Sequence, residues 1–464
     1  MGGKLRSLRN ERFDRVEHIP HPHKVRALVV NLYSSQNAGD AAALEVTISQ
    51  LRRVFPHLRL SLSMTDPAYH AEDEAVDVLS SFLGICRPWG EGRNPRPRWR
   101  LAAMSATLAD TLWAALKFRL GRWTPQGILT SERGLIEAYL QADLVVSAAG
   151  MNFYTMGRLG LPLLTSLYTA AYALMLGKPL YIISQSIGPF YRSWERWLMR
   201  WLLSKAALVF VRDTASWRLL GDMGLAGPRY RLLPDIVFAF QGAPQEQGIH
   251  LLNQYGIDVK RDRPLLGCTV VNRFIRWIPQ EVWDNYERSL IGAIRRFTER
   301  HGGKVIFFPQ TTGPTRVEDD RESARRIVAK IQETTDGIVY IDQPQPAAVL
   351  KSAYGLTDLC LATRAHAAVF ALASGVPALI VGYHWKARGI METLGLDEWV
   401  LDIDSVNEDL LSAKLEALWK ERHGVRSTLR RTIPDIVQRI EGLGPSIADD
   451  LFTRQARRGD RASP

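Results

Sequence analysis

Short apolar segments alternate with longer amphipathic ones along most of the chain. The first, "VRALVVNLY" (25–33), ends in the polar loop "SSQNAGD", and a helical pattern of apolar residues follows. The same order of strand, loop and helix returns at "ADLVVSAAGMN" (142–152), "KPLYIISQSIGPF" (178–190) and "ALVFVRD" (207–213). Apolar strands that alternate with helices predict a parallel sheet covered on both faces.

A second series of strand patterns begins at "RPLLGCTVVN" (263–272), after the loop-like "QGAPQEQG" that starts at Gln241. It continues with "GKVIFFPQ", "GIVYID", "TDLCLATRAH" and "VPALIVGYH". Two such series predict an α/β protein with two Rossmann-like, doubly wound domains that face each other across a cleft. A chain of 464 residues is also too long for one compact core.

These patterns set the expected domain boundaries. We expect a leader (1–24), an N-terminal domain (25–245) with an insertion (about 86–124), a C-terminal domain (262–425), and a C-terminal helix with a polar tail (426–464).

Charge and cysteine content narrow the partners and the compartment. The formal net charge of +11 favours anionic partners: a phosphorylated substrate, nucleic acid or an acidic membrane surface. A diffuse excess of surface arginine would give the same sum. Three scattered cysteines without a CxxC motif suit a reducing cytosol. The N-terminus lacks the apolar core of a secretion signal, so the sequence predicts a cytoplasmic protein. We expect no nucleic-acid partner.

The polar residues that follow the first strand are the first candidate site residues. Ligands of doubly wound sheets bind at the carboxyl ends of the strands. Gly39 is expected in a tight turn before a helix, where backbone N–H groups can bind an anion, with Asn37 and Asp40 beside it. The alternative is that Asp40 only caps the helix.

Two later strands also end in polar residues. Gly188 and the proline after it stop the strand pattern, so Gln185 and Ser186 are expected to face the cleft unless this is a plain turn. Arg212 ends another buried strand and could clamp a carboxylate or phosphate bidentately. The alternative for Arg212 is an ion pair, either with Asp213 or between the two domains.

The segment "TRAHAAVFALASGVPALIVGYHWKARG" offers the strongest candidates. Arg364 and His366 stand two residues apart, and on a strand end they would point to one face. Arginine holds an anion, and histidine transfers a proton near neutral pH. The alternative is a histidine at a helix N-terminus beside a solvated arginine. Tyr383 and Lys386 could add contacts to an anion.

Motifs for other chemistries are missing from the sequence. It contains no phosphate-binding P-loop, no dinucleotide-binding glycine motif, no zinc-protease motif and no serine-nucleophile elbow. We therefore expect neither a metal nor a cofactor.

Taken in order, these segments resemble the polysaccharide pyruvyl transferase family. The resembling pieces are "NAGDAA", "ADLVVSAAG", "GKPLYIISQSIGPF", "VRDTASWRLLGDMGL", "LLPDIVFAF" and the long piece that starts "TRAHAAVF", and they span roughly residues 28–400. The resemblance implies a two-domain fold similar to GT-B glycosyltransferases. It also implies transfer of a pyruvyl group from phosphoenolpyruvate to sugar hydroxyls, forming a ketal and releasing phosphate. One departure is "AAG" (148–150), where the family usually has a run of glycines.

The resemblance assigns roles to the candidates. Arg212 and Arg364 would hold the carboxylate and phosphate of the donor, His366 would act as the acid and base, and Asp40 would position the glycan acceptor. Two alternatives stay open: a GT-B glycosyltransferase that uses a nucleotide sugar, and a ligand-binding protein of the same fold without catalytic activity.

Two segments combine tryptophan with basic residues. "FYRSWERWLMRWLLSK" (190–205) places Trp194, Trp197 and Trp201 at helical spacing among arginines, and the insertion has a similar composition. Such helices can lie on an anionic membrane, where a lipid-linked acceptor would be found. The alternative is that the tryptophans pack in the core. The sequence predicts peripheral association with the inner face of the membrane, mainly through the insertion.

Overall fold

The computed structural model describes residues 24–67, 76–82, 97–121, 132–155, 161–272 and 278–462. The expected leader and the two ends of the expected insertion, with Cys86, lie outside the described residues.

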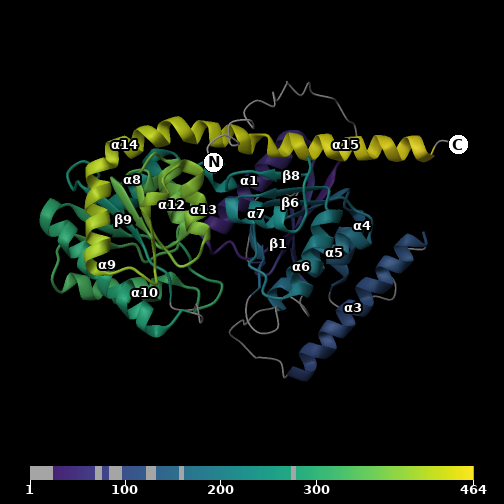
Figure 1. The fold of residues 1–464 in the computed structure, drawn as a ribbon, viewed down its shortest axis with the longest axis horizontal. Coiled ribbons are helices and arrows are strands. Elements are labelled where there is room, and N and C mark those ends of the chain that lie inside the picture. Colours follow the sequence, from purple (N-terminus) through teal and green to yellow (C-terminus); the bar gives the residue numbers. More distant parts are fainter. Residues whose placement is uncertain are drawn as a thin grey trace.

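The N-terminal domain is built on a parallel sheet (Figure 1). Along the sheet the strands run in the order β3-β2-β1-β4-β6-β7-β8, and β5 pairs with β6 beside this path. Every pairing between these strands is parallel, as the alternation of apolar and amphipathic segments predicts. The strands are β1 (Arg26–Leu32), β2 (Arg59–Met64), β3 (Val76–Ser80), β4 (Leu144–Ser147), β5 (Gly150–Phe153), β6 (Leu180–Ile187), β7 (Leu208–Val211) and β8 (Tyr230–Leu232).

Helices cover both faces of this sheet. Helices α3 to α7 and one face of the sheet form one hydrophobic core. Helix α1 packs against the other face, in a second core that continues into the second domain. Helix α1 has Asn37 as its N-cap and basic residues in its last turn, an arrangement that suits the helix dipole. The helices are α1 (Ala38–Val54), α3 (Pro97–Arg119), α4 (Arg133–Gln141), α5 (Leu161–Met175), α6 (Ser193–Lys205), α7 (Thr214–Asp222) and the short η1 (Ile236–Ala239).

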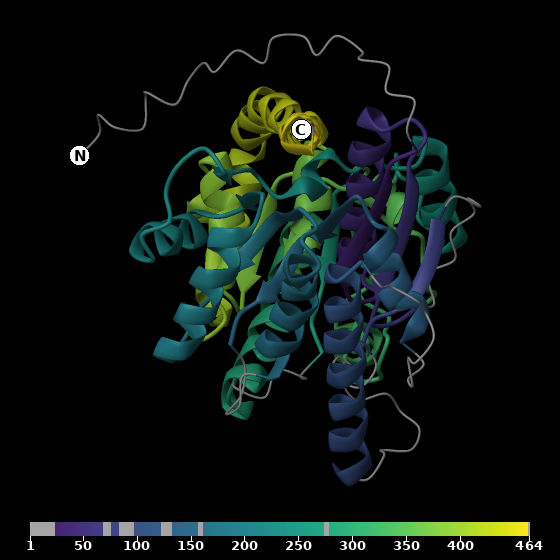
Figure 2. The same cartoon turned by 90° about the vertical axis from the view of Figure 1, so that its right-hand side faces the viewer.

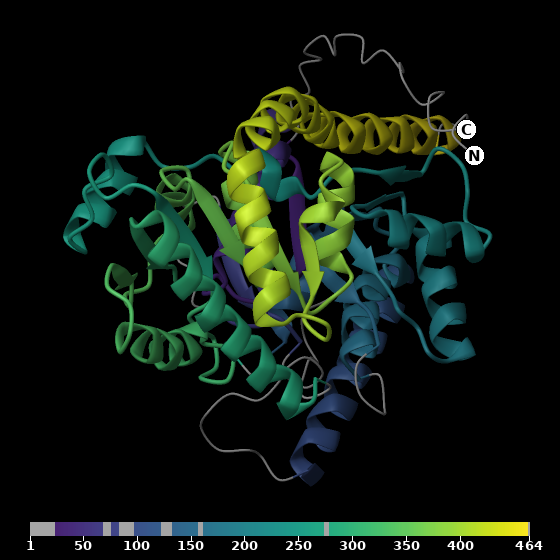
Figure 3. The same cartoon turned by 60° about the vertical axis from the view of Figure 1, so that its left-hand side comes forward.

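The second domain has a parallel sheet in the order β11-β10-β9-β12-β13-β14. Figure 3 brings this domain forward, with the long helix α14 in front of its sheet. The strands are β9 (Leu265–Thr269), β10 (Lys304–Phe307), β11 (Ile338–Tyr340), β12 (Leu359–Ala362), β13 (Ala378–Gly382) and β14 (Val400–Asp402). The helices are α8 (Gln245–Gln254), α9 (Gln280–His301), α10 (Asp320–Gln332), α11 (Ala347–Tyr354), α12 (Ala365–Ala373), α13 (Lys386–Leu394), the short η2 (Asp397–Trp399), α14 (Glu408–Glu441) and α15 (Leu443–Ala462).

The predicted fold class is confirmed, but two details of the domain organisation differ. The stretch expected as a linker contains α8, which packs so closely on α11 that Gly248 touches Ser352. Helix α14 runs without a break through the boundary expected after residue 425, and the expected polar tail is largely the helix α15. Both differences have the same cause: apolar residues of these segments are buried against the domains.

Hydrogen bonds join the two domains in several places. At the carboxyl ends of the strands, Ala38 N donates to Gln310 O (3.0 Å) and Thr312 N donates to Gln36 O (2.9 Å). On another side, α15 runs from the second domain across to the first (Figure 1), and its Asp450 accepts a hydrogen bond from Tyr181 (2.9 Å). The residues at the carboxyl ends of both sheets are therefore held in contact with each other.

Candidate active site

Arg212 lies directly after β7, and its guanidinium is buried. Its Nε donates to Ser186 Oγ (2.8 Å) and its Nη1 donates to Asp235 Oδ2 (2.8 Å). The remaining nitrogen, Nη2, is buried and has no hydrogen-bond partner among the described residues. A buried cationic donor without a partner is costly, so this nitrogen is poised to bind an anion. The alternative pairing of Arg212 with Asp213 is not found.

A chain of hydrogen bonds fixes the orientation of Arg212. Ser186 Oγ, which accepts from Arg212, donates in turn to Asp213 Oδ2 (2.7 Å). Asp213 Oδ1 accepts from the backbone N–H of Ser216 (2.7 Å), so Asp213 caps α7. The guanidinium is thus preorganised before any ligand binds.

His366 lies next to a carboxylate and an amine. Its Nε2 is 3.5 Å from Asp235 Oδ2 and 3.2 Å from Lys386 Nζ. Burial and the neighbouring Lys386 lower the pKa of His366, although Asp235 opposes this shift. His366 is therefore a neutral imidazole near pH 7 and can accept a proton.

Lys386, at the start of α13, has an unusual pKa. Burial and the positive charge of Arg212 lower the pKa of Lys386 to about 7, while Asp235 and Asp40 partly oppose this shift. The amine can therefore gain or lose a proton near neutral pH, as catalytic lysines do. A bound anion would favour its protonated form.

Gly39 brings the N-terminus of α1 against His366. A Cβ atom at Gly39 would lie 1.9 Å from His366 Nδ1, so only glycine fits here. Asn37 is the helix cap: its side chain accepts from Gly39 N (3.0 Å) and Asp40 N (3.4 Å). The backbone N–H groups that were expected to bind an anion are therefore already bonded.

Asp40 lies in the first turn of α1 and does not cap it. Burial raises the pKa of the Asp40 carboxyl, and His366, Lys386 and the two candidate arginines partly oppose this shift. Asp40 is thus close to the charged cluster.

Arg364 differs most from expectation. Strand β12 ends at Ala362, so Arg364 is the N-cap residue of α12 and His366 lies in its first turn. Thr363 N donates to the backbone O of Thr269 (3.3 Å) and to its Oγ1 (3.2 Å), and Arg364 N donates to the same Oγ1 (3.4 Å) in place of a strand carbonyl. The prediction that both residues lie on a strand end was wrong.

The guanidinium of Arg364 is held by Asp320. Its Nε and Nη2 donate to the two Asp320 carboxylate oxygens (2.9 and 2.6 Å), and the pair is almost fully buried. Burial alone would lower the pKa of Arg364, but Asp320 and Tyr383 raise it above its usual range. The bidentate face of Arg364 is therefore occupied by protein, and Arg364 is neither a free fork nor a solvated cation.

Of the three candidates around β6, only Ser186 touches the site. Gln185 is buried within the strand, where it accepts from Asn152 N (3.1 Å) and donates to Ala148 O. It thereby ties β5 to β6. Gly188 forms the turn after β6 with a φ of +85° and packs against Leu219, as the plain-turn alternative predicts. The expectation that Gln185 faces the ligand does not fit this geometry.

Asp235 is the site residue that the sequence analysis missed. It follows the short strand β8 in "LLPDIVFAF" and joins Arg212 to His366. Burial alone would raise its pKa, but Arg212, His366 and Lys386 together hold the pKa of Asp235 well below its usual range. A polar residue after a proline at a strand end is the signal that could have revealed it.

A second polar cluster borders Arg364. Tyr33 of the first domain donates to Glu318 of the second (2.8 Å), and burial and Glu318 raise the pKa of Tyr33. Tyr154 is close to Glu318 and Tyr383, and burial raises its pKa to about 12. Tyr33 and Tyr154 therefore stay neutral phenols near pH 7 and can hydrogen-bond to hydroxyl groups.

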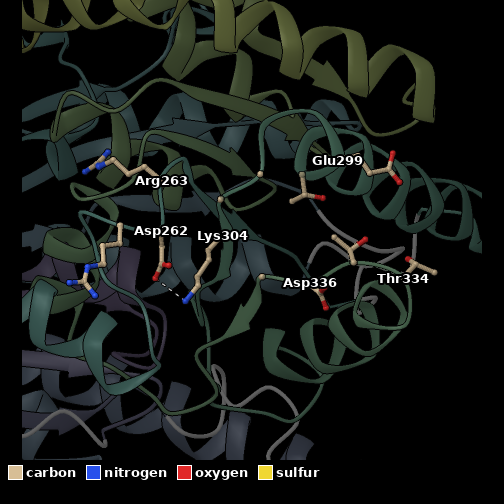
Figure 4. A pocket seen from close by; sticks show the side chains of 12 residues that line it. Asp262, Arg263, Glu299, Lys304, Thr334 and Asp336 are labelled. Atoms are coloured by element: carbon tan, nitrogen blue, oxygen red, sulfur yellow. Dashed lines mark ion pairs between the residues drawn. The ribbon is translucent and has the colours of Figure 1, made fainter.

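The described residues form no metal site, and their surface hollow lies away from this cluster. No group of three or more His, Cys, Asp or Glu side chains is placed to hold a metal within the described part of the chain. A surface hollow of about 490 Å³ is lined by Asp262, Arg263, Glu299 and Lys304 among others (Figure 4), with Asp262 paired to Lys304 (2.8 Å). It lies at the amino ends of β9 to β11, at the opposite edge of the sheet from His366.

Comparison with known proteins identifies the family. The family model described as "Polysaccharide pyruvyl transferase" matches residues 37–384. The chain belongs to this family. The matched range contains Arg212, Asp235, Arg364 and His366. A curated relative is the "Amylovoran biosynthesis protein AmsJ" of Erwinia amylovora, 24% identical over 287 residues. The match covers 60% of this chain and 66% of that protein, just under two thirds of its length.

Solved structures confirm the GT-B type of fold. A UDP-GlcNAc 2-epimerase from Neisseria meningitidis, bound to UDP-GlcNAc, aligns with a TM-score of 0.54 over 93% of this chain and 100% of the other, at 11% identity. An α,α-trehalose 6-phosphate synthase from Burkholderia multivorans aligns with a TM-score of 0.52 over 94% and 99%, at 12% identity. At such identities the likeness concerns the fold alone.

Proposed function

We propose that this member of the polysaccharide pyruvyl transferase family transfers a pyruvyl group from phosphoenolpyruvate to two hydroxyls of a glycan, forming a ketal and releasing phosphate. The single observation that carries the proposal is the buried, unpartnered Nη2 of Arg212 in one cluster with Lys386 and His366. The family membership and the exopolysaccharide relative support it.

The donor is a small trianion, and the cluster offers matching cations. Arg212 would bind the phosphate or the carboxylate through Nη2, and Lys386 would bind the same donor in its protonated form. Arg364 is proposed as a positioning residue, because its bidentate face is engaged with Asp320. Asp40 and the tyrosines near Glu318 are proposed contacts for the acceptor hydroxyls.

The proposed reaction balances without an oxidant or reductant. A proton is added to C3 of the donor while the first acceptor oxygen bonds to C2. The bond from C2 to the phosphate oxygen then breaks, and the second hydroxyl closes the ketal. Of the two hydroxyl protons, one replaces the proton given to C3 and the other leaves with phosphate.

His366 and Lys386 are the proposed proton carriers. Neutral His366 accepts a hydroxyl proton, and Asp235 stabilises the imidazolium that forms. Lys386, with a pKa of about 7, can return a proton to His366 or to C3. The positive charge of Arg212 stabilises the departing phosphate.

Thermal stabilisation tests the donor directly. A ligand that binds the native state raises its stability by mass action, by about 2.7 kcal/mol at 100 times its Kd. We expect phosphoenolpyruvate to raise Tm in a concentration-dependent way and UDP-GlcNAc to leave Tm unchanged. The reverse pattern would favour the nucleotide-sugar glycosyltransferase. Stabilisation by phosphoenolpyruvate without phosphate release in the presence of any glycan acceptor would favour the non-catalytic alternative.

Gly39→Ala is expected to lower phosphate release from phosphoenolpyruvate by at least about tenfold. The new methyl group would lie at the position of the His366 ring and displace it, and small misplacements of a catalytic group are costly. Gly424→Ala is the matched control, because Gly424 is also within a helix and has open space around it. Equal rates for the two variants would remove the contact between Gly39 and His366 from the mechanism.

The pKa of Lys386 predicts how donor binding depends on pH. A bound anion raises the pKa of Lys386, because it stabilises the protonated amine. The affinity for phosphoenolpyruvate is therefore highest below about pH 7 and falls as the pH rises through about 7, the pKa of Lys386 in the unliganded protein. Calorimetric titration with phosphoenolpyruvate should show a loss approaching about tenfold per pH unit above that value.

In Lys386→Met the affinity should be lower at pH 7 and independent of pH above it. His366 titrates at lower pH, since its pKa is already depressed, and His384 titrates at about 4. If Lys386→Met keeps the wild-type decline above pH 7, another group is responsible.

A further inference from the structure

Helix α3 carries a stripe of large apolar side chains that face solvent. Leu108, Leu112, Leu116 and Leu120 follow one another at intervals of four residues from within α3 to just beyond its end, and Trp113 lies beside them. Their side chains are 37%, 52%, 52%, 62% and 49% exposed, respectively. Isolated exposed leucines are ordinary, but a contiguous stripe of this kind marks an interaction surface.

The opposite face of α3 already holds the helix to the domain. Ala114 and Ala115 are buried in the core that α4, α5 and α6 share, and Arg119 Nε donates to Met175 O of α5 (2.8 Å). Helix α3 is therefore apolar on both sides over this length. A helix with that pattern normally has both sides covered.

Helix α6 has a second exposed aromatic face. Trp194, Trp197 and Trp201 are exposed, with Trp197 at 66%, so the alternative that these tryptophans pack in the core is wrong. The one acidic residue of the helix, Glu195, is buried and paired with Arg192 (2.8 Å). The exposed charged residues of α6 are all basic: Arg196, Arg200 and Lys205.

The two helices belong to the same layer. Both pack against α5, α3 through Arg119 and α6 through direct helix contacts, and both contribute to the same hydrophobic core on one face of the sheet. Figures 1 and 2 show α3 at the edge of this layer, with one end projecting beyond the rest of the domain. Both exposed faces therefore belong to helices of the layer that covers this face of the sheet.

We propose that the outer side of α3 and α6 docks on an anionic lipid bilayer. The occupant is identified by charge: the described side chains of α3 and α6 include no exposed acidic residue, whereas Lys117 lies beside Trp113 of the apolar stripe and α6 adds three basic residues. Leucine, tryptophan and basic residues on one surface are the composition of helices that lie in the membrane interface. None of the described helices is long and apolar enough to cross a bilayer. The proposal does not depend on the donor chemistry.

Sedimentation of the full-length protein with vesicles tests this surface. We expect the protein to pellet with vesicles of phosphatidylglycerol and phosphatidylcholine at low salt, less so at high salt, and weakly with phosphatidylcholine alone. The triple substitution Leu112→Ser, Trp113→Ser, Leu116→Ser should lower partitioning by at least about tenfold. Leu410→Ser is the matched control, because Leu410 is 37% exposed on α14. Thermal melts would verify that each variant is folded.

The basic residues of α6 allow a second, independent test of vesicle binding. The substitutions Arg196→Gln, Arg200→Gln and Lys205→Gln should weaken binding to the anionic vesicles and leave the weak binding to phosphatidylcholine unchanged. Wild-type protein that stays in the supernatant with anionic vesicles at low salt would overturn the proposal. So would a triple variant of α3 that pellets like wild type. A wild-type dimer that the α3 substitutions convert to a monomer, without vesicle binding, would assign the stripe to a second copy of the chain.

Discussion

His366→Ala is expected to reduce turnover of phosphoenolpyruvate by about 10²–10⁴-fold, the usual contribution of a general acid and base. The imidazole lies between Asp235 and Lys386, and as a neutral base beside a carboxylate it can take up a proton and return it. Donor binding should remain measurable, because Arg212 and Lys386 are still in place. Phosphate release and calorimetry on the same variant separate the two effects.

His384→Ala is the control for this experiment. His384 lies beside Lys386, whose backbone N donates to its Nδ1 (3.4 Å), and burial and Lys386 lower the pKa of His384 to about 4. Its removal should change turnover much less. Near wild-type turnover in His366→Ala would remove His366 from the mechanism.

Arg212→Lys is expected to weaken binding of phosphoenolpyruvate by at least about tenfold, or about 1.4 kcal/mol. Lysine keeps the charge but cannot bond to Ser186, Asp235 and a ligand at once with the geometry of a planar fork. Isothermal titration calorimetry of the folded variant measures the loss. A thermal melt is needed alongside, because the Arg212 pair with Asp235 is buried.

Arg364→Lys is the matched comparison. Sequence reasoning gave both arginines the same role, but Arg364 is bonded bidentately to Asp320 while Arg212 keeps one nitrogen without a partner. We therefore expect a smaller loss of affinity for phosphoenolpyruvate in Arg364→Lys than in Arg212→Lys. The reverse order would show that the Arg364 pair opens to bind the donor.

The fold could be predicted from the sequence because the buried strands of a parallel sheet are apolar on both faces. Strands such as β6, buried throughout, stand out as continuous apolar runs between helices. The pattern did not reveal β2, β3, β8 and β14. Strands β8 and β14 have three residues each, no residue of β3 is fully buried, and serines alternate with the apolar residues of β2. Helix α8 was taken for a loop because its few buried residues cover only α11.

Only part of the candidate site could be predicted from the sequence, and the reason differs from that for the fold. Arg212, His366 and Lys386 each follow a strand, so the rule for parallel sheets finds them. Their partners depend on contacts between distant segments: Asp320 lies 44 residues from Arg364, and Gly39 meets His366 across the two domains. No local pattern shows which side chain neutralises a given arginine. For that reason Arg364 was assigned as a free fork and Asp235 was not assigned at all.

Product analysis in ²H₂O tests whether the protein forms a pyruvyl ketal from phosphoenolpyruvate. The protein is incubated with phosphoenolpyruvate and a glycan acceptor, and the acceptor is examined by mass spectrometry and NMR. C3 of the donor must take one proton from solvent or from an exchangeable group such as Lys386. We therefore expect a pyruvyl ketal whose methyl group carries one deuterium, together with an equal amount of phosphate. Absence of the ketal with every acceptor, while a sugar is transferred from a nucleotide sugar under the same conditions, would contradict it.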